Sequence, residues 1–148
     1  MQERNSRNKV LIENLPLSII ETVYKHKEKI VKIGKYAFNS KDDRYLNFIK
    51  HGFKCAKCGI EGKYVNLETN YKGNHFNVYA EKDGEKIMLT KDHIYPKSKG
   101  GLNNIKNYQV LCEKCNTKKA DNSPMRLSIA LQNRICYEKI SRKSCKTT

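Results

Sequence analysis

Two pairs of cysteines constrain the fold of this 148-residue chain more than any other feature. Each pair has two residues between its members, and residues 59–111 separate the pairs. A Cys-x-x-Cys turn places two sulfur atoms on one side of a zinc ion, and zinc prefers four tetrahedral ligands. The pattern therefore predicts one closed, structural zinc site whose ion contributes to folding. The predicted zinc ligands are Cys55, Cys58, Cys112 and Cys115. Separate redox or disulfide roles for the two pairs are the alternative.

The number of cysteines and the hydropathy of the chain indicate the cellular location to expect for this protein. We find no export signal and no apolar run of the roughly 20 residues that a membrane span needs. Six cysteines in such a chain favour metal binding over a disulfide framework. Cys136 and Cys145 are expected to be inert thiols. We expect a cytoplasmic, membrane-free protein, and a short basic chain of this type is compatible with a phage or bacterial origin.

The charge of the chain predicts a polyanionic partner. Thirty Lys and Arg residues against fifteen Asp and Glu residues give a formal net charge of +15. An excess of this size is typical of proteins that bind nucleic acids. A solvated, lysine-rich surface without a specific partner is the alternative. With 38% hydrophobic residues, the chain suits one compact domain with small terminal appendages.

The first fifty residues predict an arm and two helices. Residues 1–15 are polar and mixed in charge, as in a mobile arm. Pro16 can open a helix whose apolar residues recur at helical spacing as far as Gly34. Ser40 followed by Asp43 resembles a capping box for a second helix, which Gly52 would end.

The middle of the chain predicts a small antiparallel sheet. Apolar and polar residues alternate around residues 65–67, 76–80 and 87–89, and Asp83-Gly84 is a typical hairpin turn. A polar loop over residues 96–107, a strand over 108–111 and a helix over 113–120 follow. Ser123 and Pro124 would open a C-terminal helix. The fold class is therefore α+β.

Three residues between and beside the cysteine pairs have the chemistry of a second metal site. Asp92 and Asn116 offer hard oxygen ligands of the kind that Mg²⁺ or Mn²⁺ binds. His93 can take a proton from water. In a regular strand His93 would point away from the face that carries Asp92, so we expect the backbone to bend there. Asn107 is ambiguous, because an asparagine before a strand is often a turn former.

These residues together resemble the HNH endonuclease family in its zinc-bearing form. The resemblance rests on Asp-His-Ile-x-Pro-x-Ser-x-Gly-Gly at residues 92–101 and on Asn-x-Gln-x-Leu-Cys-x-x-Cys-Asn-x-x-Lys at residues 107–119. It implies a ββα-metal core within the α+β fold, with the four-cysteine zinc site, a small antiparallel sheet and flanking helices. It further implies a nuclease core over residues 51–122, an N-terminal helical extension over 1–50, and a C-terminal helix and tail over 123–148.

The resemblance also implies a role for each site residue. His93 would be the general base, and Asp92 and Asn116 would hold one catalytic Mg²⁺ or Mn²⁺. Asn107 would take the middle position, which ties the loop in place and orients the base. Many members have histidine where this chain has Asn116, and an oxygen ligand there favours Mg²⁺ or Mn²⁺ over softer ions.

The expected reaction is hydrolysis of DNA to 5′-phosphate and 3′-hydroxyl ends. Four lysines flank the motif and are expected to contact phosphates: Lys97, Lys99, Lys118 and Lys119. The sequence leaves open a monomer or a homodimer. Two other functions are weighed against this one: a noncatalytic zinc-ribbon protein that binds nucleic acid, and a nuclease that acts on RNA.

Overall fold

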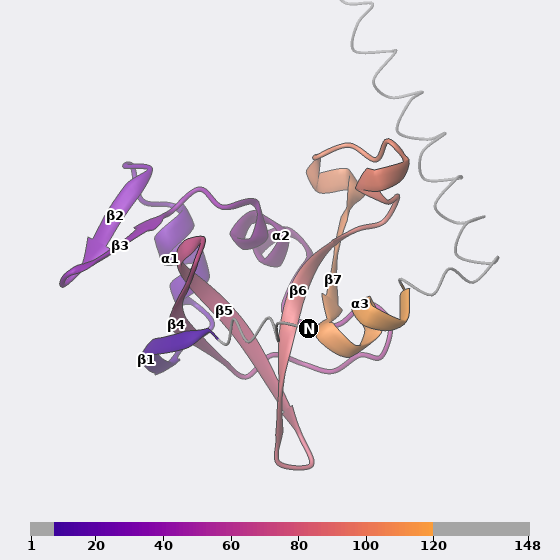
Figure 1. The fold of residues 1–148 in the computed structure, drawn as a ribbon, viewed down its shortest axis with the longest axis horizontal. Helices are drawn as coiled ribbons and strands as arrows, with labels where there is room; N and C mark the ends of the chain where they lie inside the picture. The colour runs from indigo at the N-terminus through magenta and orange to yellow at the C-terminus, as the bar shows by residue number, and fades with distance from the viewer. Residues whose placement is uncertain (1–7, 120–148) are drawn as a thin grey trace, which may run out of the picture.

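The computed structural model describes residues 8–119. These residues form an α+β structure whose main sheet has five antiparallel strands in the order β1-β4-β5-β6-β7, as Figure 1 shows. The strands are β1 (Lys9–Leu15), β4 (Tyr64–Asn70), β5 (Gly73–Lys82), β6 (Glu85–His93) and β7 (Tyr108–Cys112). The α+β class predicted from the sequence is confirmed.

The meander from β4 to β6 follows the local sequence signals. β5 and β6 join at Asp83 and Gly84, whose φ angles of 52° and 74° suit a two-residue type I′ turn. The predicted hairpin is therefore confirmed. In the ladders Val65 lies opposite Val78, and Val78 lies opposite Leu89, so the apolar residues of neighbouring strands share one face.

The prediction of a mobile arm at the N-terminus is wrong for residues 9–15. These residues form β1, which pairs with β4 at the edge of the main sheet. The ladder is irregular, and Asn14 adopts a φ of 56° while its N–H donates to Asn66 Oδ1 at 3.0 Å. The backbone hydrogen bonds of β4 supply the order that the polar sequence does not indicate, and Leu11, Ile12 and Leu15 pack against the core.

The long helix predicted from Pro16 towards Gly34 is also wrong beyond its start. Helix α1 covers Ile19–Tyr24, and a two-stranded sheet of β2 (Ile30–Ile33) and β3 (Tyr36–Asn39) follows. Gly34 turns the chain with a φ of 57°. Three β-branched residues in β2 and a glycine at the turn favour a hairpin over a helix, and the polar run before them interrupts the helical pattern.

The second predicted helix exists, but its cap differs. Helix α2 covers Asp43–His51 and ends at Gly52, whose φ of 81° permits the sharp exit. The N-cap is Asp42, which accepts a hydrogen bond from the backbone N–H of Arg44 at 2.8 Å. Ser40, the predicted cap, is instead fully buried and donates to the carbonyl of Glu28.

The core lies between one face of the main sheet and the helices α1 and α2. Figure 1 shows both helices on the same side of the strands as the β2–β3 hairpin. Phe76 of β5 contacts the rings of Phe38 and Tyr45 edge-on, at centroid distances of 4.8 and 6.1 Å. The Tyr45 hydroxyl also accepts the backbone N–H of Phe76. This core fixes the main sheet, and the strands β6 and β7 of that sheet lead to the candidate site.

The segment from β6 to the end of the described chain carries the candidate site. After β6, two short 3₁₀ turns, η1 (Lys97–Lys99) and η2 (Ile105–Asn107), shape the predicted loop. β7 then leads directly into α3 (Glu113–Lys119), as predicted. The predicted C-terminal helix, Cys136 and Cys145 lie outside the described residues. None of the helices in residues 8–119 is long and apolar enough to span a bilayer.

Candidate metal centre and active site

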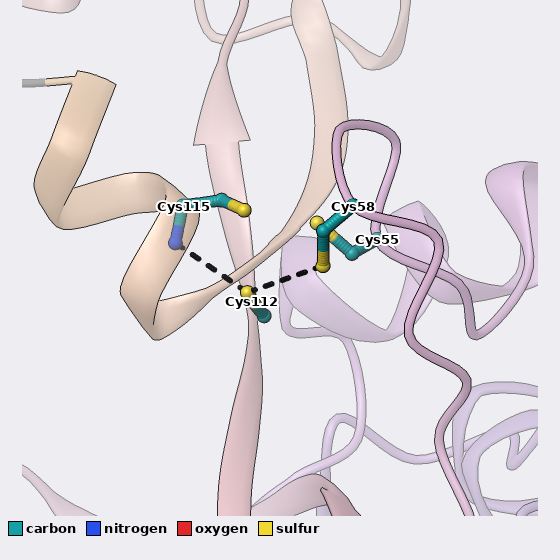
Figure 2. Close-up of side chains that lie close together, drawn as sticks. All are labelled: Cys55, Cys58, Cys112 and Cys115. Carbon is teal, nitrogen blue, oxygen red and sulfur yellow. Dashed lines mark hydrogen bonds between the residues drawn. The ribbon is translucent and has the colours of Figure 1, made fainter. Parts of the chain in front are cut away.

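The four cysteines of the two predicted pairs lie together. Their sulfur atoms are all within 4.8 Å of one another, and Figure 2 shows them converging from two sides. Cys55 and Cys58 come from the loop between α2 and β4, whereas Cys112 ends β7 and Cys115 lies in the first turn of α3. Residues far apart in the sequence thus form one cluster.

The cluster fits a zinc ion. Tetrahedral ligands at a Zn–S distance of about 2.3 Å have sulfur atoms about 3.8 Å apart, and Cys58 Sγ lies 3.8 Å from Cys112 Sγ. The backbone N–H of Ala56 donates to the carbonyl of Val110 at 2.8 Å and joins the first turn to β7. Gly59, with a φ of 78°, allows its N–H to reach the carbonyl of Cys55. The four thiols could therefore hold a zinc ion with little rearrangement.

The surroundings of the sulfur atoms shift the pKa values of the thiols in different directions. Burial opposes ionisation of Cys55, but the backbone N–H groups of Cys58, Cys112 and Lys57 outweigh it, and the pKa of Cys55 falls to about 6. Burial raises the pKa of Cys112 and, together with the neighbouring thiols, that of Cys115 to about 12. Burial of Cys112 and Cys115 thus favours their neutral thiols, and a bound cation would favour the thiolates.

A cleft separate from the cysteine cluster lies at the C-terminal end of β6. It has a volume of about 400 Å³ and contains three of the predicted site residues: Asp92, His93 and Asn116. Its lining is completed by Lys91, Pro96, Lys97, Ser98, Lys99 and Lys119. Four lysines and one carboxylate make this cleft strongly basic, as a binding site for a phosphate diester requires.

Asp92 is held by two donors on the side of the sheet where α3 lies. Its Oδ2 accepts from Gln109 Nε2 at 2.8 Å and from Lys119 Nζ at 2.5 Å. The Asp92 side chain is only 12% exposed. Both bonds engage Oδ2. Within residues 8–119 no hydrogen bond is seen to Oδ1, so the lone pairs of that oxygen can bind another ligand.

A hydroxyl fixes the orientation of the Asn116 amide. Thr90 donates its hydroxyl hydrogen to the carbonyl of Leu111 at 2.8 Å, so its oxygen is left to accept from Asn116 Nδ2 at 3.1 Å. The Asn116 amide nitrogen is thereby assigned, and its oxygen is the atom available to a cation. Thr90 was not singled out from the sequence, although it lies two residues before Asp92 and therefore on the same face of β6.

His93 ends β6 on the opposite face. The ladder stays regular, with Asp92 opposite Gln109 and His93 opposite Tyr108, so the bend predicted between Asp92 and His93 is absent. The chain turns after His93 instead, and the loop folds back so that Asn103 Oδ1 lies 2.8 Å from His93 Nε2. An amide oxygen only accepts, so a hydrogen bond to it requires the tautomer with the proton on Nε2, in which Nδ1 has the free lone pair.

Asn107 ties this loop together from inside. It is 7% exposed, and its Oδ1 accepts from the backbone N–H of Tyr95 at 2.8 Å. Its Nδ2 donates to the carbonyls of Tyr95 and Leu102 at 3.1 and 3.0 Å. Gly101 is required close by, since a Cβ there would lie 2.1 Å from the carbonyl oxygen of Tyr95. Asn107 thus fixes the loop, while the contact to the imidazole comes from Asn103.

The four lysines predicted to contact phosphate occupy different places. Lys97 and Lys99 are exposed at the rim of the cleft. Lys119 also lines the cleft, but its ammonium group points at Asp92. Lys118 is exposed and lines a different hollow, beside Cys58, Cys112 and Cys115. Lys91, which was not predicted, reaches the cleft with its ammonium 4.3 Å from the centre of the Tyr108 ring.

Residues 78–131 match the family model of HNH endonucleases. The matched segment begins in β5 and contains the cleft, the loop and the second cysteine pair. No significant match was found among curated proteins or among solved structures. The resemblance to this family found in the sequence is thereby confirmed for residues 78–131.

Proposed function

We propose that this protein is a metal-dependent DNA endonuclease that hydrolyses phosphodiester bonds to 5′-phosphate and 3′-hydroxyl ends. The observation that carries the proposal is the basic cleft that Asp92, His93 and Asn116 all line, within the segment that matches the HNH family. On this proposal β6, β7 and α3 form the ββα-metal core, and the four-cysteine cluster is its structural zinc site.

The oxygen donors of the cleft fit a divalent metal ion. Asp92 and Asn116 would hold it, and two oxygen ligands with the remaining positions left to water and phosphate suit Mg²⁺ or Mn²⁺. The lysine ammonium beside Asp92 supports this assignment, because the site already attracts a cation. When bound, the ion supplies neutralisation of the charge that develops on the phosphate and on the departing oxygen.

His93 is the proposed general base. Its Nδ1 takes one proton from a water molecule while the water oxygen forms a bond to phosphorus. The bond between phosphorus and the 3′ oxygen breaks, and the 3′ oxygen leaves with the electron pair and then takes a proton from solvent. Asn103 keeps the proton on Nε2 and so maintains the basic tautomer. A positioned base of this kind contributes about 10²–10⁴-fold to the rate.

The remaining residues of the cleft bind and orient the substrate. Lys97 and Lys99 are exposed at its rim and would contact the phosphates on either side of the cleaved bond. Asn107 and Gly101 hold the loop that presents them. Binding through lysine–phosphate contacts releases counterions, so DNA affinity should fall steeply as the salt concentration rises.

Nicking of a supercoiled plasmid tests the function directly. The wild-type protein should convert supercoiled DNA to the open circle in Mg²⁺ or Mn²⁺, and His93→Ala should slow this by about 10²–10⁴-fold while zinc content and DNA affinity stay unchanged. Asn74→Ala, in β5 and outside the cleft, is the matched control and should cut normally. Normal cutting by His93→Ala would show that the base is assigned wrongly.

A noncatalytic zinc-ribbon protein that binds nucleic acid is the second candidate. The four-cysteine cluster favours it, because such a cluster alone builds a binding module. Under this function, the wild-type protein binds DNA in a salt-dependent way but leaves plasmids intact with every divalent ion. Cleavage of a matched RNA but not of DNA would instead identify a ribonuclease at the same site.

A further inference from the structure

The Lys119 ammonium group occupies a position that an ion would use. It lies 2.5 Å from Asp92 Oδ2, contacts the carbonyl oxygen of His93, and is 3.4 Å from that of Ile94. A carboxylate and backbone carbonyls are hard oxygen ligands, the type that Mg²⁺ and Mn²⁺ choose. An ammonium group has three donors and no acceptor, so these contacts use its full capacity.

The Lys119 contact is the most enclosed of the ion pairs within residues 8–119, ahead of Arg44 and Asp42, whose side chains are 29% and 23% exposed. The side chains of Lys119 and Asp92 are 17% and 12% exposed, whereas those of Lys114 and Glu85 are 50% and 59% exposed. Surface pairs contribute little, but a charge enclosed to this degree needs a compensating partner. Asp92 without Lys119 would be a nearly buried carboxylate with one neutral donor, Gln109.

We infer that Lys119 is the resident cation of the metal site, which competes with the divalent ion for Asp92. Without the ion, the ammonium neutralises Asp92 and holds the end of α3 against the end of β6. An ion that binds Asp92 replaces the ammonium, and the released lysine swings into the basic cleft that it already lines. This inference rests on the proposed function, because it takes Asp92 as a metal ligand. It makes Lys119 a positioning residue whose departure accompanies ion binding.

Competition of this kind lowers the apparent affinity for the ion. The apparent dissociation constant equals the intrinsic constant divided by the fraction of molecules in which Asp92 is free. Removal of the ammonium makes that fraction close to one and leaves a full negative charge for the ion. A structural role alone predicts the reverse, since a variant that loosens the site would bind the ion more weakly.

The first experiment measures Mn²⁺ binding to the zinc-loaded protein by electron paramagnetic resonance of the free ion. Lys119→Met keeps the length of the side chain and removes its charge, and we expect Mn²⁺ to bind at least about tenfold more tightly. Lys118→Met is the matched control, because it removes the same charge from the neighbouring, exposed position on α3. Asp92→Asn identifies the Mn²⁺ that binds at this site.

The second experiment uses the wild-type protein and does not depend on a variant that folds. A short pulse of acetic anhydride, read by mass spectrometry, reports the reactivity of each lysine amine. Addition of Mg²⁺ should raise the acetylation rate of Lys119 severalfold and leave that of Lys118 unchanged. An ammonium held on Asp92 reacts slowly, and a released one reacts as an exposed lysine does.

The outcomes separate this inference from the proposed function. In one outcome, Asp92→Asn abolishes Mn²⁺ binding, but Lys119→Met and Lys118→Met bind Mn²⁺ with equal affinity. This outcome overturns the inference and still supports the metal site at Asp92. A Lys119 acetylation rate that Mg²⁺ does not change overturns it as well. Mn²⁺ binding that is unaffected by Asp92→Asn removes the metal site itself, and the inference falls with it.

Discussion

The buried side chain of Asn107 should decide whether the loop over the cleft is ordered. Asn107→Ala removes three hydrogen bonds, to the N–H and carbonyl of Tyr95 and to the carbonyl of Leu102. A net value of about 1 kcal/mol for each bond gives a loss of about 3 kcal/mol. The cost is local, since these bonds all lie between the end of β6 and the start of β7.

Hydrogen exchange of the amide of Ile94 measures this loss directly. Its N–H donates to the backbone carbonyl of Asn107 at 2.8 Å, an acceptor that alanine keeps, so a change in exchange reports opening of the loop. A loss of about 3 kcal/mol corresponds to a fall in protection of roughly 10²-fold when exchange proceeds through local opening. Zinc content should stay at one per chain, because the cysteine cluster is held by other bonds.

Asn104→Ala is the matched control in the same loop. The Asn104 side chain makes one hydrogen bond, to the N–H of Lys106 at 3.0 Å, and it is half-buried. We expect its removal to cost about 1 kcal/mol and to change the protection of Ile94 by less than tenfold. Equal protection of Ile94 in the two variants would refute the argument that Asn107 holds the loop.

Three further perturbations test other parts of the structure. Cys112→Ser should abolish retention of zinc and cooperative unfolding, because the binding energy of a structural zinc, about 10–16 kcal/mol, exceeds the stability of a small domain. Gly101→Ala should lower plasmid nicking severalfold and cost about 2–3 kcal/mol in urea unfolding, since a Cβ overlaps the Tyr95 carbonyl at 2.1 Å. Asp42→Asn should flatten the acid limb of the stability curve. Burial raises the pKa of Asp42, but the attraction of Arg44 outweighs burial and the net shift of this pKa is downward. The stabilisation by ionised Asp42 is therefore fully present above pH 3.8, and it is lost as the pH falls through the lower pKa of the folded protein.

Each of these predictions has its own control. Cys145→Ser, at a cysteine outside both pairs, should keep one zinc per chain, and retention of zinc by Cys112→Ser would contradict the cluster. Gly84→Ala has a φ of 74° but open space around the added Cβ, so it should cost only the left-handed strain of about 1–2 kcal/mol. An acid limb that is the same in Asp42→Asn and in Asp83→Asn, at an exposed turn residue, would count against the effect of Arg44.

Local signals predicted the parts of the fold that depend on neighbours in the chain. The Asp83-Gly84 turn, the alternation in β4 to β6 and the passage of β7 into α3 all follow from residues a few positions apart. Helical periodicity does not reveal the hairpin of β2 and β3, because the apolar residues on either side of a lysine-rich run fall at the spacing of one helical stripe. The turn at Gly34 and the β-branched residues of β2 were the signals that favoured strands.

The sequence by itself determined the ligand types of both candidate sites, because thiols in Cys-x-x-Cys turns and hard oxygen donors have chemistry that does not depend on the fold. Only the tertiary structure decided which side chains donate hydrogen bonds to these ligands or accept hydrogen bonds from them. Asn103 on His93, Thr90 behind Asn116 and Lys119 on Asp92 join residues ten or more positions apart. Such pairs leave no local pattern, since a hydrogen bond across a sheet or loop depends on strand register and on how the chain returns.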